Sequence, residues 1–442
     1  MKIKFLGAAG GIVTGSCYWL QGDRGGLVVD MGMFQGLNSR ELNANMPEID
    51  VENIEGVLVT HAHLDHGGRL PLLVKMGYKG KVYMTAATRD LVELSLHDTV
   101  KIAREDNRER MFGEEEVAQL LSQIEIFNIG EEKTLGDFKI SFLRAGHILG
   151  AASVLVEEKG KSVVFSGDIG TGESPLIKPP EAPEKADVVV LESTYGNRLH
   201  GMEDEKKILK EVIDEVVESR GVLLLPVFSI QRSQRILHLL DHIQREGGLP
   251  NNMKVYFDSP MAIEATHIFG KYRQEYGGEL TGHAKKDDPF DFPGLVVTRQ
   301  AWEKKIIRKD KNPKIIVAGS GMMSGGRIMG HAKEYLSQAS TRLLMVGYQA
   351  MGTLGRKIVD GERLVNIDRV DIDVKASVRQ LHSMSAHADQ RQLLDWLTEI
   401  KGVSKVILTH GEDGPREALS KEILKIHKVG IEKPGLGDTL EV

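Results

Sequence analysis

The sequence has almost no cysteine: Cys17 is the single one among 442 residues. One thiol cannot form an internal disulfide, and such sparse cysteine is typical of proteins from a reducing cytosol. The sequence also lacks the run of about 18 apolar residues that a membrane-spanning helix requires. Its first residues, MKIKFLGAAGG, hold no sustained apolar stretch of the kind found in export signals. We therefore expect a cytoplasmic protein without a membrane anchor.

An excess of positive charge is missing as well. Lysine and arginine number 57 against 63 aspartate and glutamate residues, which gives a net charge of −6. This balance argues against a protein that binds nucleic acid over its whole surface. A polyanionic substrate stays compatible with the sequence if positive charge is local, for instance from divalent ions in a cleft.

Internal repeats are absent, and the pattern of strands and helices changes twice along the chain. Short strands with glycine turns fill the beginning, helices and strands alternate after about residue 200, and the first style returns near residue 370. Alternating strands and helices are typical of a parallel sheet. We predict an α/β protein with one domain inserted into another: residues 1–200 and 371–442 form the first domain, and residues 201–370 form the insert.

The stretch THAHLDHGG places four side chains that can bind metals within six positions: His61, His63, Asp65 and His66. The spacing differs from the helical HEXXH pattern, because residues two apart do not share a helix face. In an extended segment His61 and His63 would point the same way. Four such side chains in six residues indicate a metal site rather than a polar loop with incidental histidines.

Three further candidate ligands follow apolar strands at their ends: His147 (AGHILG), Asp168 (SGDIG) and His410 (THGE). With the four side chains of the first cluster, they make seven candidates, too many for one tetrahedral ion. Two ions that share a bridging carboxylate fit the number, and Asp168 is the natural bridge. Imidazoles and carboxylates without thiolates favour Zn²⁺, with Mn²⁺ or Fe²⁺ as alternatives.

These motifs resemble a known family. HAHLDH, together with Asp30, His147 and Asp168, is similar to the metallo-β-lactamase superfamily. LESTYGNR, MSAHAD and VILTHGE resemble motifs A, B and C of its β-CASP nuclease branch, and in particular the compact bacterial and archaeal ribonucleases related to the endonuclease subunit of the cleavage and polyadenylation specificity factor. The resemblance implies an αββα metallo-β-lactamase sandwich with an inserted parallel-sheet α/β domain.

The resemblance also implies a role for each site residue. It assigns His61, His63 and His147 to one zinc ion. It assigns Asp65, His66 and His410 to the other, and Asp168 to both. Asp30 would orient ligands, although it could also simply begin a turn. Two Zn²⁺ ions per chain, or Mn²⁺ in their place, would activate water for attack on a phosphodiester. His387 would be the general acid, and Glu192 would orient it.

A glycine-rich turn in the insert, AGSGMMSGGR, follows an expected strand and precedes an expected helix. Its backbone N–H groups, the hydroxyls of Ser320 and Ser324, and Arg327 would then contact a substrate phosphate. An ordinary strand-to-helix turn is the alternative. Of two lone histidines nearby, His331 and His382, we place His331 nearer to substrate.

The function implied by the resemblance is hydrolysis of single-stranded RNA in RNA processing or decay. Cleavage within the strand is the first expectation, and 5′-to-3′ exonuclease activity is the alternative. A different hydrolase of the same fold would lack the long insert, and a noncatalytic scaffold would have lost ligands that are all present here. The resemblance also allows a homodimer.

Overall fold

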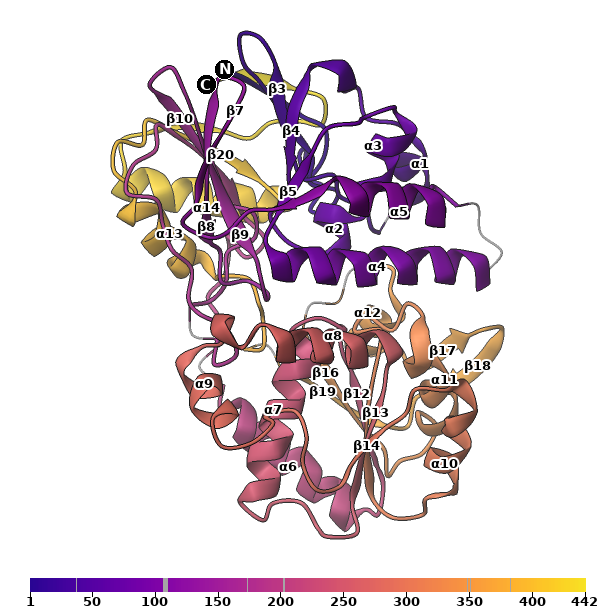
Figure 1. Ribbon diagram of the computed structural model, residues 1–442. Coiled ribbons are helices and arrows are strands. Elements are labelled where there is room, and N and C mark those ends of the chain that lie inside the picture. The colour runs from indigo at the N-terminus through magenta and orange to yellow at the C-terminus, as the bar shows by residue number, and fades with distance from the viewer. Residues whose placement is uncertain are drawn as a thin grey trace. The chain divides into compact units, whose positions relative to one another are not determined.

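The computed structural model describes the chain apart from a few positions: Leu37, Asp106–Glu109, Glu173, Met202, Tyr348, Ala350 and His382. The prediction for His382 therefore lies outside the described residues. The chain divides into two compact units (Figure 1). The first unit combines Met1–Leu199 with Ala386–Val442, and the second is His200–Ser385.

The first unit holds two mixed sheets. Among the described residues, one sheet has the order β22, β1, β2, β3, β4, β5, β6, with parallel pairing from β3 onward. Its strands are Thr439–Glu441, Lys2–Phe5, Tyr18–Gln21, Gly26–Val29, Ile54–Leu58, Val82–Met84 and Ile124–Ile126. The other has the order β21, β20, β11, β10, β9, β8, β7, with parallel pairing from β21 to β10. Its strands are Gly430–Glu432, Lys405–Thr409, Val188–Glu192, Lys161–Phe165, Ala152–Glu158, Phe138–Arg144 and Glu132–Leu135.

The two sheets share one apolar core. Phe5 and Leu20 from the first sheet pack in the same buried cluster as Phe142 and Val154 from the second. Helices cover the outer faces, with α4 on β6 and α14 on β20. The helices of this unit are α1 Ser39–Ala44, α2 Leu64–Gly67, α3 Pro71–Lys75, α4 Ala86–Glu105, α5 Glu114–Gln123, α13 Gln390–Glu399 and α14 Asp413–Ile426, with a 3₁₀ turn at Val51–Asn53. The predicted αββα sandwich is confirmed.

Polar residues collect where parallel strands of both sheets end. Asp30 follows β3, the segment to His61 follows β4, and Asp168 comes soon after β10. Glu192 is the last residue of β11, and His410 comes directly after β20. Carboxyl ends of parallel strands are the usual place for sites in α/β proteins. The strand ends thus bring residues from distant parts of the sequence to one region of the first unit.

The second unit is built on a parallel sheet with the described strand order β14, β13, β15, β12, β16, β19. These strands are Leu295–Val297, Lys254–Asp258, Lys314–Ala318, Val222–Pro226, Arg342–Val346 and Ser377–Leu381; β17 Leu364–Ile367 and β18 Val370–Asp373 form a separate hairpin. The helices are α6 Glu205–Glu218, α7 Arg232–Arg245, α8 Pro260–Lys271, α9 Gly278–Ala284, α10 Lys304–Lys309, α11 Gly326–Tyr335 and α12 Leu354–Val359, with 3₁₀ turns at Arg273–Glu275 and Ala301–Glu303. The predicted parallel-sheet α/β insert is confirmed.

The end of the inserted unit differs from the predicted boundary at residue 370. The unit extends to Ser385, because β19 pairs in parallel with β16 along its whole length. The sequence of β19, SVRQL, shows a strand but does not say which sheet the strand joins. The boundary therefore moves past β19, and the chain re-enters the first unit just before His387.

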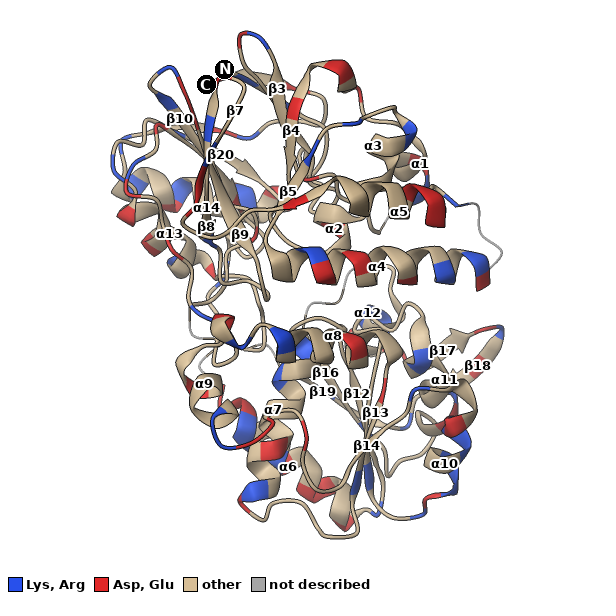
Figure 2. Cartoon of the chain, viewed as in Figure 1, with Lys and Arg blue, Asp and Glu red and all other residues tan. Residues whose placement is uncertain are grey.

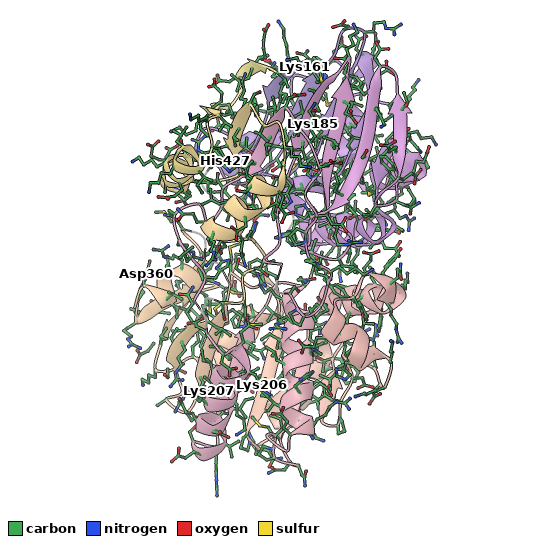
Figure 3. The ribbon with its side chains drawn as sticks, turned by 90° about the vertical axis from the view of Figure 1, so that its left-hand side faces the viewer. Lys161, Lys185, Lys206, Lys207, Asp360 and His427 are labelled. Carbon is green, nitrogen blue, oxygen red and sulfur yellow. The ribbon has the colours of Figure 1, made fainter. Side chains whose placement is uncertain are left out.

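Charges of both signs are spread over the surface of each unit (Figure 2). Lys206 and Lys207 lie at the surface on α6 (Figure 3). Lys206 contacts Oε1 of Glu246 at 2.8 Å, and Lys210 contacts Asp214 one turn later at 2.5 Å. Exposed pairs of this kind contribute little to stability. In the described part of the chain, no helix combines the length and apolarity that crossing a membrane requires.

Candidate metal centre and catalytic residues

The THAHLDH segment changes from extended chain to helix inside the motif. His63 has extended backbone angles (φ −64°, ψ 148°), and α2 begins at Leu64, so Asp65 and His66 lie on the helix. The segment is held against Gly32, where a Cβ atom would lie 1.7 Å from the carbonyl oxygen of Asp65. Only glycine fits at that position, which explains the glycine in VVDMG.

One set of four side chains meets beside β4 and β10. Nδ1 of His63 lies 3.2 Å from Nε2 of His61 and 3.1 Å from Nε2 of His147. Oδ2 of Asp168 lies 3.4 Å from Nε2 of His61 and 3.5 Å from Nε2 of His147. A tetrahedral zinc ion with ligand atoms at about 2.0–2.1 Å would separate those atoms by about 3.3–3.4 Å. These four separations match the spacing of ligand atoms in a tetrahedral site.

A second set surrounds the other oxygen of Asp168. Its Oδ1 lies 3.3 Å from Nε2 of His66 and 3.5 Å from Nε2 of His410. The two imidazole nitrogens are 3.2 Å apart, and Oδ2 of Asp65 lies 3.6 Å from Nε2 of His410. The two oxygens of Asp168 thus face different sets of ligands. Oδ1 is buried and has no hydrogen-bond partner among the described residues, which fits a metal ligand.

Burial keeps the first set of imidazoles neutral. It lowers the pKa of His61 and His147 well below the usual value, and lowers that of His63 to about 4. Burial alone would raise the pKa of Asp65, but His410 and His66 lower it to about 2. Neutral imidazoles and ionised carboxylates are the forms that bind metals. These protonation states therefore suit cation binding near neutral pH.

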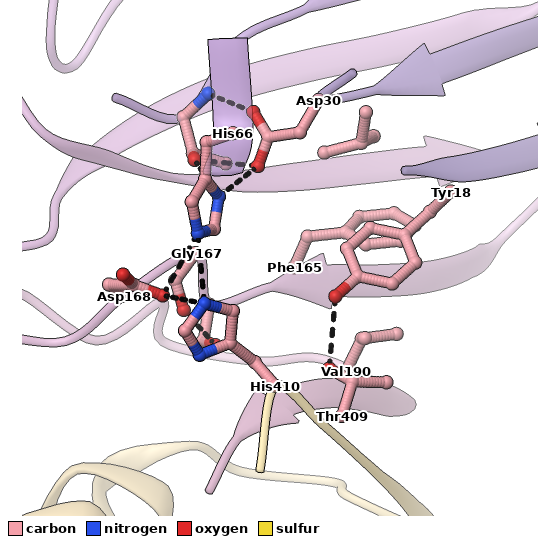
Figure 4. Close-up of a pocket in the computed structure, with 12 residues that line it drawn as sticks. Tyr18, Asp30, His66, Phe165, Gly167, Asp168, Val190, Thr409 and His410 are labelled. Carbon is pink, nitrogen blue, oxygen red and sulfur yellow. Dashed lines mark hydrogen bonds and ion pairs between the residues drawn. The ribbon is translucent and has the colours of Figure 1, made fainter. Parts of the chain in front are cut away.

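Asp30 holds the ring of His66 from the side opposite Asp168 (Figure 4). His66 donates from Nδ1 to Oδ2 of Asp30 at 2.7 Å, while the backbone N–H of Thr60 donates to Oδ1, also at 2.7 Å. Burial alone would lower the pKa of His66, but Asp168 and Asp30 raise it well above its usual value. A carboxylate behind an imidazole fixes its orientation and makes its other nitrogen a better ligand.

Two of these residues have a left-handed backbone. Asp30 has φ 60° and His410 has φ 50°. A non-glycine residue in this region costs of the order of 1 kcal/mol, and such residues gather at functional sites. In both residues this backbone conformation directs the side chain from the end of a strand toward the candidate ligands.

His387 joins the centre through the loop that follows Asp168. Gly170 pairs with His387 in an isolated antiparallel bridge, and the N–H of Ala388 donates to the carbonyl of Ile169 at 2.7 Å. Ile169 in turn donates its N–H to Oε1 of Glu192 at 2.8 Å. A Cβ atom on Gly170 would lie 1.8 Å from the carbonyl oxygen of Gly146. The loops that carry His147, Asp168 and His387 are therefore packed closely together.

The imidazole of His387 faces two carboxylates. Its Nδ1 lies 3.2 Å from Glu192 and 3.9 Å from Oδ2 of Asp168. Burial alone would lower the pKa of His387, but Glu192 and then Asp168 raise it above the usual value. An imidazole whose charged form is favoured in this way can donate a proton during a reaction.

The sequence matches three family descriptions in succession. Residues 10–205 match the metallo-beta-lactamase superfamily, residues 233–358 the Beta-Casp domain, and residues 371–433 the Zn-dependent metallo-hydrolase RNA specificity domain. Ribonuclease TTHA0252 of Thermus thermophilus is 36% identical over 442 residues, with 99% of each chain covered. The chain belongs to the metallo-β-lactamase superfamily, in its β-CASP ribonuclease branch. It is a metal-dependent hydrolase.

Other members of the β-CASP branch align over most of the chain. An RNase J-like protein of Methanocaldococcus jannaschii is 30% identical, with 97% of this chain and 96% of that protein covered. Cleavage and polyadenylation specificity factor 73 of Drosophila melanogaster is 28% identical, with 95% and 61% covered. A crystal structure of a protein of unknown function from Enterococcus faecalis V583 shares the fold, with a TM-score of 0.56, 11% identity and 99% of each chain covered.

The second unit, His200–Ser385, contains the Beta-Casp match and is called the β-CASP unit below. It holds the residues predicted to contact substrate, and two of them contact another side chain. His331 is buried, and its Nε2 lies 2.7 Å from Oδ2 of Asp258. Arg327 binds the other oxygen of Asp258 and donates to the carbonyl of Thr298 at 3.0 Å. Both contact the buried carboxylate of Asp258 within the unit, and their predicted contact with substrate stays a prediction. Ser320 and Ser324 lie in the predicted turn between β15 and α11 with their hydroxyl oxygens 3.5 Å apart.

Two threonines that support the candidate metal ligands of the first unit were missed in the sequence. Thr60 donates from Oγ1 to Oδ2 of Asp30 at 2.8 Å, and Oγ1 of Thr194 lies 3.0 Å from Nδ1 of His410. Thr60 directly precedes His61, and Thr194 lies two residues after Glu192. This proximity to predicted site residues was the available signal, but threonine near a strand end is too common to stand out.

Proposed function

We propose that this chain is a dinuclear-zinc ribonuclease that hydrolyses phosphodiester bonds within single-stranded RNA, in RNA processing or decay. The observation that carries the proposal is the position of Asp168, whose two oxygens each face a separate set of histidines. The relatives named as ribonucleases and the RNA specificity domain description support RNA as the substrate.

In this proposal each set of donors holds one ion. His61, His63 and His147 hold the first, Asp65, His66 and His410 hold the second, and Asp168 bridges them. When bound, the two ions supply an activated water and neutralise charge on the phosphate. Zn²⁺ is proposed because the donors are imidazoles and carboxylates at tetrahedral spacing, and Mn²⁺ is the alternative.

The proton for the leaving oxygen comes from His387. Glu192 accepts the hydrogen bond of Nδ1, which orients the ring and makes Nε2 the nitrogen that donates. Asp30 and Thr60 keep His66 in place during the reaction, and Thr194 does the same for His410. Ser320 and Ser324 contact a substrate phosphate in this proposal, from the turn that precedes α11.

The test combines metal analysis with cleavage of labelled RNA. The same RNA is labelled at its 5′ or 3′ end, and a third sample has a blocked 5′ end. We expect internal fragments from all three, and slower cleavage of the same sequence as a duplex or as DNA. Loss of cleavage with the blocked end would favour a 5′-to-3′ exonuclease, and fewer than about two ions per active chain would overturn the dinuclear centre.

We also propose a cytoplasmic enzyme, on the basis of a single cysteine that is buried as a free thiol. Light scattering during gel filtration would measure whether the chain forms the homodimer that the family resemblance allows.

A further inference from the structure

Four potential ligands from two helices meet in the β-CASP unit. His238 and His242 lie one turn apart on α7, and Glu279 and His283 lie one turn apart on α9. Residues four apart share a helix face, so each helix presents a pair of donors. Figure 1 shows α9 beside α7.

The donors of the two helices lie close together. One ring nitrogen of each histidine lies within 4.8 Å of a ring nitrogen of each of the others. Oε1 of Glu279 lies 3.3 Å from Nε2 of His238 and 3.9 Å from Nε2 of His242. The ring centroids of His238 and His242 are 4.4 Å apart, and the ring of His283 lies 5.3 and 5.5 Å from them. The three imidazoles therefore converge on one place, and the carboxylate of Glu279 lies beside two of them.

The ring of His238 is fully buried beside these donors, with its Nε2 toward Glu279. Burial, together with His242 and His283, lowers the pKa of His238 to about 3. Its ring is therefore neutral at physiological pH and offers a lone pair.

A second carboxylate lies behind His283. Oδ2 of the fully buried Asp241 lies 3.1 Å from Nε2 of His283. Asp241 also accepts from Nε of Arg245 at 2.8 and 3.0 Å, so its position is fixed. Histidine ligands commonly place one nitrogen on the metal and the other against such a carboxylate.

We propose that His238, His242, Glu279 and His283 bind one Zn²⁺ ion that fastens α9 to α7. Imidazole donors select zinc over magnesium and calcium, which prefer oxygen ligands. Four protein ligands fill a tetrahedral ion and leave no position for substrate, which makes this a structural site. Asp241 orients His283. This ion is additional to the two ions of the proposed catalytic centre.

The test is a zinc titration of the full chain after its metals have been removed by a chelator. We expect the wild-type chain to bind one equivalent more than His242→Ala, and one more than Glu279→Gln. Because both side chains are partly exposed, these variants should fold, and circular dichroism checks this. His267→Ala is the matched control, since it removes an exposed histidine from neighbouring α8.

The comparison measures a difference of one equivalent, so it does not depend on how the catalytic centre is filled. Zinc should also raise the melting temperature of the β-CASP unit in the wild-type and His267→Ala chains, and should do so less in the other two variants. Equal zinc stoichiometry in all four chains would overturn the proposal. If His242→Ala fails to fold, Glu279→Gln decides the result.

Discussion

Nδ1 of His387 lies 3.2 Å from each carboxylate oxygen of Glu192. The carboxylate therefore holds the proton of Nδ1 and favours the charged form of the ring, which is why the pKa of His387 is raised despite its burial. Glu192 is itself fixed by the N–H of Ile169. The pair has the geometry of a positioned general acid with its supporting carboxylate.

Replacement of this acid should reduce turnover and leave the metals in place. We expect His387→Ala to lower kcat by about 10²- to 10⁴-fold, the usual contribution of a general acid. The metal content should not change, because His387 lies outside both ligand sets. His427→Ala is the control, since it removes a histidine that contacts Thr398 between α13 and α14. Unchanged turnover in His387→Ala would show that another group protonates the leaving oxygen.

The pH profile should respond to Glu192. Activity requires protonated His387, so it persists below the pKa of His387 and falls as the pH rises through that pKa. Glu192→Gln removes the charge that contributes most to raising this pKa, while its amide oxygen can still accept from Ile169. The alkaline limb of kcat against pH should therefore move to lower pH. It should stay in place in Glu184→Gln, which alters an exposed carboxylate.

Asp30 should control metal affinity without touching the metal. Asp30→Asn exchanges the carboxylate behind His66 for an amide that supports the imidazole less well. We expect metal affinity to fall about 10- to 100-fold. Competition with a chelator of known affinity measures this change. Asp23→Asn, on the surface beside Lys159, is the control, and the same affinity for both variants would contradict the assigned role.

Removal of the metals should destabilise the first unit. Without cations, imidazole nitrogens only 3.1–3.2 Å apart are left facing one another. An ion present at about 1,000 times its dissociation constant stabilises the folded state by about 4 kcal/mol. Calorimetry should show a lower melting temperature in chelator and recovery with added Zn²⁺. Use of the His242→Ala chain excludes the site proposed between α7 and α9, and an unchanged melting temperature would argue against a bound metal.

The β-CASP sheet should be sensitive to loss of core volume. Leu224 in β12 is fully buried, so Leu224→Ala should lower the free energy of unfolding of this unit by about 2–5 kcal/mol. Leu364→Ala removes an exposed leucine of β17 and should change it by less than about 0.5 kcal/mol. Urea unfolding followed by circular dichroism compares the two. Equal effects would place Leu224 outside the cooperative core.

The sequence predicts the candidate metal ligands better than the residues that hold those ligands in place. His61, His63 and His66 stand out because metal-binding side chains crowd at a strand end, and only a few chemistries use such a pattern. The contribution of Thr60 could not be predicted, because its hydrogen bond depends on the direction of the Asp30 side chain. The contact between Arg327 and Asp258 could not be predicted for the same reason: a basic residue in a glycine-rich turn suggests phosphate, and the carboxylate comes from a distant segment of the chain.

The same limit applies to β19 and to the histidines of α7. Strand character can be predicted from SVRQL, but its partner β16 depends on tertiary packing. His238 and His242 have ordinary helical spacing, and their meeting with His283 is set by how α9 lies on α7. Local pattern thus predicts elements and crowded motifs, whereas contacts between distant segments require the structure.

The pairing of His66 with His410 joins positions 344 residues apart. At a synthesis rate of about 5–20 residues per second, a ribosome needs roughly 17 to 70 seconds to travel from one to the other. Throughout that interval the nascent chain holds an incomplete second ligand set, and the strand β20 that presents His410 has not yet been made. A growing chain therefore cannot assemble the proposed dinuclear centre until the inserted unit and β20 have been made.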